Sequence, residues 1–147
     1  MNNIEEYWPF SDVTTDFPSI YDGAETFLKQ FAKEDPVQRN LFCAYWVQAE
    51  ILNGGLEQFF ANSTGVLAPE AVEAINKIGL INLSKSLKHA ISLFGEPYPR
   101  ERKIRKAKLP EIVDSLEEIE DEFINNLYDE NGGLEAMAIK YVSQKNS

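Results

Sequence analysis

Residues 48–65, which read QAEILNGGLEQFFANSTG, constrain the fold of this chain more than any other stretch. Apolar residues recur there at helical spacing, but Asn53, Gly54 and Gly55 interrupt them. Two glycines after an asparagine are typical of a helix end, where the backbone turns sharply through left-handed conformations that other residues resist. The sequence therefore predicts a long helix that ends at Asn53 and a short helix over residues 56–61.

The same stretch carries polar side chains within its apolar run. Buried polar groups need partners, so these residues form either an internal network or a binding site. In the first interpretation, which we favour, they satisfy backbone groups left open at the helix ends. In the second, they line the pocket of an enzyme or small-ligand binder in which Glu50 is a general base. The residues concerned are Gln48, Glu50, Asn53, Gly54, Gly55, Gln58 and Asn62.

The remainder of the chain is also helical in pattern. Apolar residues recur three and four apart, and no segment shows sustained two-residue alternation of the kind that strands produce. We therefore predict an all-α protein with about seven helices in a single compact domain, residues 22–147. Residues 1–21 mix aromatic and acidic residues with prolines, which indicates an irregular arm whose aromatic residues pack on the domain, or equally an interaction surface.

Several helix boundaries can be predicted from capping residues. Asp22, with Glu25 three residues later, is expected to begin the first helix, and Asp35 before a proline to begin the second. The stretch before Pro110 is expected to be partly helical. A long helix should then run from Pro110 to about Tyr128.

The long helix concentrates acidic residues. Seven carboxylates in twelve residues occupy about 18 Å of helix, or one charge per about 2.6 Å, which approaches the one per about 1.7 Å of duplex DNA. Carboxylates three or four residues apart are neighbours on the helix surface. An ordinary solvated helix face is the alternative interpretation. The acidic amino-terminal third of the chain is expected to contribute to the same surface. The predicted partner-binding residues of the helix are Glu111, Asp114, Glu117, Glu118, Glu120, Asp121 and Glu122.

Charge is distributed unevenly along the chain. The formal net charge of -10 argues against nucleic acid or an anionic membrane as a direct partner, because both would be repelled. Residues 70–110 nevertheless hold nine bases and four acids, whereas residues 111–147 hold ten acids and two bases. The basic stretch 100–108 is expected to pair with the acidic helix of the same chain or of a second subunit, or else to bind an anion itself. We favour the pairing.

The polar stretch also carries a family resemblance. It follows the pattern Q-x-E-x-x-N-G-G-x-x-Q-F-F-x-N-x-x-G and resembles the bacterial family named after its DNA-mimic proteins, over about residues 41–142. The resemblance implies a protein that presents carboxylates in place of phosphates and occupies the DNA site of a basic DNA-binding protein, such as a transcription regulator or nucleoid protein. The matching residues are Gln48, Glu50, Asn53, Gly54, Gly55, Gln58, Phe59, Phe60, Asn62 and Gly65.

Other functional classes receive less support. The common catalytic templates are missing from the sequence, and His89 is the only histidine, so we predict no catalytic residue, no cofactor and no metal site. Cys43, the only cysteine, is expected in the core. The amino terminus lacks the features of a signal peptide, which predicts a cytoplasmic protein. An immunity-type inhibitor of a basic toxin would use the same acidic helix, and a homodimer is compatible with the opposite charge blocks.

Overall fold

The computed structural model describes residues 19–145, so almost all of the predicted arm, residues 1–21, lies outside the described part. Residues 19–145 form six α-helices, two 3-10 helices and no strand, which confirms the all-α prediction. The α-helices are α2 (Ala24–Phe31), α3 (Pro36–Ala61), α4 (Ala68–Ile78), α5 (Ile81–Ser92), α6 (Arg102–Asp129) and α7 (Leu134–Lys145), and the 3-10 helices are η1 (Ser63–Leu67) and η2 (Glu130–Gly132).

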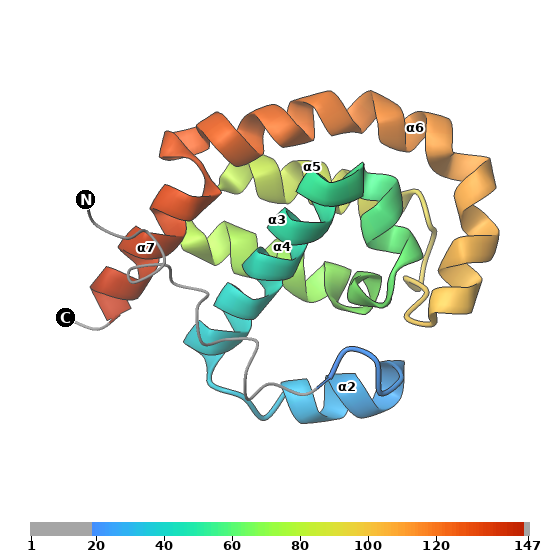
Figure 1. Ribbon diagram of the computed structural model, residues 1–147, viewed down its shortest axis with the longest axis horizontal. Coiled ribbons are helices and arrows are strands. Elements are labelled where there is room, and N and C mark those ends of the chain that lie inside the picture. Colours follow the sequence, from blue (N-terminus) through green and yellow to red (C-terminus); the bar gives the residue numbers. More distant parts are fainter. Residues whose placement is uncertain (1–18, 146–147) are drawn as a thin grey trace.

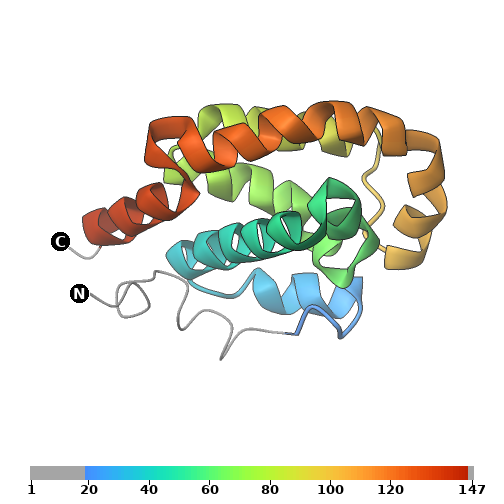
Figure 2. The same cartoon turned by 45° about the horizontal axis from the view of Figure 1, so that its top comes forward.

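The helices pack around a core that α3 and α6 dominate. α3 packs against α4 and α6, and α5 packs against α4 and α6. Figure 1 shows α6 arching along one edge of the molecule, with α7 at one end of this arch. Figure 2 shows α2 beneath α3, and the rings of Phe27 and Phe31 of α2 contact Phe42 of α3 at centroid distances of 6.1 and 5.7 Å. Each helix therefore buries one apolar face against its neighbours.

The two predicted helix starts had different outcomes. Asp35 is the N-cap of α3, and its carboxylate accepts a hydrogen bond from the Gln38 amide at 3.1 Å, as predicted. The prediction for Asp22 was wrong, because α2 begins two residues later and Gly23 is its N-cap without a side-chain hydrogen bond. Gly23 has φ 93° and ψ 150°, which turns the chain into the helix one residue after Asp22.

The glycine turn is present where it was predicted. Gly54 (φ -155°, ψ 15°) and Gly55 (φ 79°, ψ -172°) depart from helical geometry inside α3 and divide it into a long first part and a short second part. We call residues 56–61 the short helix. Counting the two parts of α3 separately, the described residues contain the seven predicted helical segments.

The prediction that the long helix begins at Pro110 was wrong. α6 begins at Arg102 and contains Pro110 in its interior. A proline cannot donate a hydrogen bond to the carbonyl four residues earlier, here that of Lys106, so it was expected to start the helix rather than interrupt it. Figure 1 shows the first turns of α6 set at an angle to the remainder. These turns are held by tertiary contacts of Arg102 and Arg105 that the local sequence does not reveal.

None of the helices in the described residues is long and apolar enough to span a membrane.

Candidate functional site

Six of the seven predicted partner-binding carboxylates lie exposed along α6. The buried stripe of Leu116, Ile119 and Phe123 holds the opposite face of the helix in the core, which directs the acidic residues outward. We call these six residues the acidic ridge: Glu111, Asp114, Glu117, Glu118, Asp121 and Glu122.

Glu120 differs from the residues of the acidic ridge. It is half-buried, and its Oε1 accepts a hydrogen bond of 2.7 Å from the backbone amide of Leu56, the first residue of the short helix. A carboxylate at a helix N-terminus satisfies a free N–H group and matches the positive end of the helix dipole. A Cβ atom at Gly55 would overlap the Glu120 carboxylate, so the glycine permits this contact. Glu120 therefore caps the short helix and does not lie on the outer face of α6.

Replacing Glu120 with glutamine is expected to lower the free energy of unfolding by about 1 kcal/mol, because a neutral amide oxygen is a weaker cap than a carboxylate. Urea denaturation followed by circular dichroism measures this loss. Glu117→Gln, which removes an exposed charge one turn earlier on α6, is the control and should change stability by less than about 0.5 kcal/mol. Equal effects of the two substitutions would contradict the capping role.

The second candidate group forms a brace across the glycine turn. Glu50 Oε2 accepts a hydrogen bond of 2.6 Å from Asn62 Nδ2 and a longer one of 3.5 Å from Gln58 Nε2, which links the two parts of α3. Gln48 Nε2 donates to Glu135 Oε1 of α7 at 2.9 Å, and Asn53 is exposed at the turn. The amides thus bind the one carboxylate that was considered as a general base. In the described residues, Glu50, Gln58 and Asn62 therefore form an internal network with one another and do not bind the backbone groups that the favoured interpretation assigned to them.

Arg105 occupies a position that the sequence analysis missed. The side chain is fully buried, its Nε donates to the Phe60 carbonyl at 2.9 Å, and its Nη2 donates to the Asn62 carbonyl at 2.8 Å. Its Nη1 donates to the carbonyls of Pro99 and Arg100. Burial lowers the pKa of Arg105, but an arginine remains charged at neutral pH. Arg105 is four residues before Leu109, and this helical spacing could have placed the arginine on the buried stripe of α6.

The motif residue Gly65 lies directly against this arginine. A Cβ atom at Gly65 would stand 2.7 Å from Arg105 Nε, so a larger residue would displace the guanidinium. Tyr98 also donates from its hydroxyl to the Gly65 carbonyl at 2.7 Å, and burial raises the pKa of that hydroxyl. The last glycine of the motif therefore belongs to the same buried network as Arg105.

The basic stretch 100–108 has a different role from the one predicted. Arg102 donates to the Ala61 carbonyl at 2.7 Å, and Arg100 binds the Val66 carbonyl at 2.7 Å and Glu70 at 2.6 Å. Within the described residues, the ion pair that joins the stretch to the acidic ridge is that of Lys108 and Glu111, at 3.6 Å. Pairing of these arginines with the acidic helix of the same chain was therefore wrong, because Arg102 and Arg105 bind carbonyls at the end of the short helix and Arg100 binds the Val66 carbonyl and Glu70.

Together these contacts hold the short helix from both ends. Glu120 binds its N-terminus, whereas Arg105 and Arg102 bind carbonyls at its C-terminus. Both signs of charge match the helix dipole. We call this arrangement, in which α6 supplies all three side chains, the clamp.

Two further residues that the sequence singled out are Cys43 and His89. Cys43 is buried in the core as predicted, and burial raises the pKa of its thiol, so it stays protonated at neutral pH. It borders a hollow of about 310 Å³ between α2, α3 and α4. His89 is exposed near the end of α5. In residues 19–145, no three acidic, histidine or cysteine side chains are grouped to hold a metal ion.

Comparison with known proteins identifies a family. The family model described as "DMP19-like protein" matches residues 32–145, which include the whole region of predicted resemblance. The match confirms the predicted resemblance to the family of DNA-mimic proteins. No curated protein and no solved structure matches the chain.

Proposed function

Because the chain belongs to the DMP19-like protein family, we propose that it binds a basic DNA-binding protein through the acidic ridge and blocks the DNA site of that protein. The exposed row of carboxylates on α6 is the observation that carries this proposal. Six charges in about 18 Å of helix amount to one per about 3 Å, within a factor of two of the spacing along duplex DNA. A basic surface that binds phosphates would be attracted to this row.

The rigidity of the ridge supports the same function. α6 buries Leu116, Ile119 and Phe123 in the core and is tied to the short helix by the clamp. Carboxylates on a fixed helix keep their relative positions before a partner arrives. Binding then costs less ordering entropy than it would on a flexible acidic segment.

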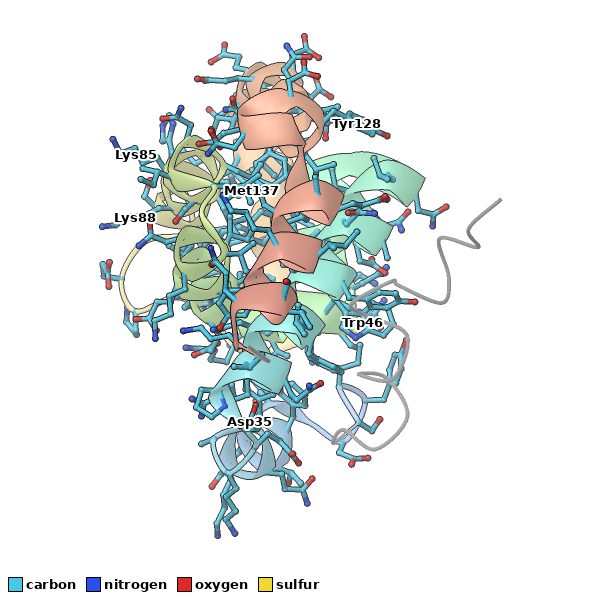
Figure 3. All side chains as sticks on the ribbon, turned by 90° about the vertical axis from the view of Figure 1, so that its left-hand side faces the viewer. Asp35, Trp46, Lys85, Lys88, Tyr128 and Met137 are labelled. Carbon is cyan, nitrogen blue, oxygen red and sulfur yellow. The ribbon has the colours of Figure 1, made fainter. Side chains whose placement is uncertain are left out.

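Basic residues on another helix favour one orientation of the partner. Figure 3 shows Lys85 and Lys88 of α5 on one side of α7, and Tyr128 of α6 on the other. Tyr128 is seven residues, or two turns, after Asp121 and so lies on the same side of α6 as that residue of the acidic ridge. Both lysines are exposed. A basic partner would be repelled by α5 and attracted to the acidic ridge, so the charge distribution directs it to one face.

Neutralising three residues of the acidic ridge should weaken partner binding by about tenfold or more, because each lost charge contact contributes about 0.5–1 kcal/mol. The variant carries Asp114→Asn, Glu118→Gln and Asp121→Asn. Proteins captured from bacterial lysate by the immobilised wild type should be transcription regulators or nucleoid proteins, and duplex DNA should release them. Their affinities for wild type and variant are then measured by calorimetry.

The matched control removes three exposed carboxylates elsewhere, through Glu73→Gln, Glu96→Gln and Glu101→Gln. It changes the net charge by the same amount and should reduce affinity by less than about threefold, since distant charges are screened. Capture that duplex DNA does not reverse, or that the ridge variant retains in full, would contradict the proposed function.

A further inference from the structure

The acidic ridge has a lower charge density than the DNA with which it would compete. The ridge has one carboxylate per about 3 Å, whereas duplex DNA has one phosphate per about 1.7 Å. Lys108 pairs with Glu111 at 3.6 Å and weakens the field of the ridge further. On charge alone, a basic site would therefore prefer DNA. A protein that displaces DNA from such a site needs an attraction that does not depend on charge.

A groove beside the acidic ridge has the chemistry for such an attraction. It has a volume of about 280 Å³ and lies between α6 and the short helix. Val113, on its α6 wall, is next to Asp114 and one turn before Glu117, so the groove borders the first half of the ridge. Its lining is mainly apolar and consists of Ala61, Leu109, Pro110 and Val113, with Glu57 and Lys106 as its charged members.

The walls of the groove are held in place before any partner binds. The short helix, which carries Glu57 and Ala61, is fastened to α6 at both ends by the clamp. Pro110, in the interior of α6, also lines the groove. A preformed apolar groove gains more from a bound side chain than one that must first be ordered.

We propose that this groove receives one aliphatic side chain of the basic protein that the acidic ridge binds, an inference that rests on the proposed function. The apolar walls match an aliphatic side chain, and Glu57 and Lys106 together give neither sign of charge an advantage there. The neighbouring carboxylates select a basic partner, and the groove adds a contact that sodium chloride does not screen. Partial burial of one such side chain should strengthen binding about tenfold, mainly by slowing dissociation.

Two matched peptides test the groove without knowledge of the natural partner. Both are alanine-based helical peptides with lysines at every third or fourth position, and they differ only in a central leucine or alanine. Fluorescence anisotropy at low and high sodium chloride measures their affinities for the protein. We expect wild type to bind the leucine peptide about tenfold more tightly, with a ratio that persists at high salt while both affinities fall.

Three variants separate the groove from the ridge. Val113→Gln places a polar side chain on the groove wall and should abolish the preference for leucine, whereas Val113→Ile keeps the wall apolar and should retain it. The ridge variant Asp114→Asn, Glu118→Gln, Asp121→Asn should weaken both peptides equally and keep the preference. Equal binding of the two peptides by wild type, or a preference that Val113→Gln retains, would overturn the groove proposal alone. Full affinity of the ridge variant at low salt would overturn the proposed function instead.

Discussion

Replacing Arg105 with methionine is expected to lower the free energy of unfolding by about 3–5 kcal/mol, the largest effect of any single substitution that we predict. Methionine fills much of the same space but donates no hydrogen bond. The carbonyls of Phe60, Pro99 and Arg100 would then lose the guanidinium donor, and the Asn62 carbonyl would keep its bond from the Gly65 amide. Since small domains are stable by about 5–15 kcal/mol, this loss would be a large fraction of the total.

Urea denaturation followed by circular dichroism tests this expectation, with two controls on the same helix. Lys103 is exposed, so Lys103→Met should change stability by less than about 0.5 kcal/mol. Arg102 is exposed and binds the Ala61 carbonyl, so Arg102→Met should cost about 1 kcal/mol. A cost for Arg105→Met no larger than that for Arg102→Met would show that the clamp does not depend on the buried guanidinium.

Replacing Gly55 with alanine should cost about 2–4 kcal/mol, through two separate effects. Its backbone angles, φ 79° and ψ -172°, belong to a region that only glycine adopts readily, which contributes about 1–3 kcal/mol. The added Cβ would also overlap the Glu120 carboxylate and displace it from the Leu56 amide, which removes a cap that contributes about 1 kcal/mol.

Gly23 provides a matched control for the backbone effect. It has similar angles, φ 93° and ψ 150°, but no atom lies within 4 Å of the position that its Cβ would occupy. Gly23→Ala should therefore show backbone strain without the steric overlap and cost at least about 1 kcal/mol less than Gly55→Ala. In a Glu120→Ala background, Gly55→Ala should cost less than in wild type, because the overlapping carboxylate is gone. An unchanged cost in that background would contradict the predicted contact.

Local features of the sequence predicted much of this fold. Asp35 before a proline indicated the start of α3, and the pair Gly54 and Gly55 indicated its interruption, because both signals depend on backbone geometry within a few residues. The prediction at Pro110 was wrong because contacts between distant parts of the chain overrode the local signal. A proline favours a helix start locally, but Arg102 and Arg105 bind carbonyls about forty residues earlier in the chain and extend the helix past it.

In the candidate site, too, the local sequence predicted some features and contacts between distant residues decided others. Helical spacing placed the carboxylates of α6 on its surface and the apolar stripe beneath them, which the exposure of the acidic ridge matches. The spacing could not distinguish Glu120 from Glu117, since the two residues are neighbours on one helix. Only the approach of the Leu56 amide, 64 residues away in sequence, makes Glu120 a cap. The groove beside Val113 was not predicted either, because its opposite wall belongs to the short helix.

The sequence by itself determined the helical class, the glycine turn within residues 48–65 and the family, because periodicity, helix-end chemistry and a motif are all local properties. The tertiary structure alone decided which charges are exposed and which bind the backbone. Glu120 and Arg105 have the same residue types as their exposed neighbours, but each is brought against the free polar groups at one end of the short helix. Burial beside unsatisfied backbone groups, rather than charge or spacing, gave these two residues their structural role.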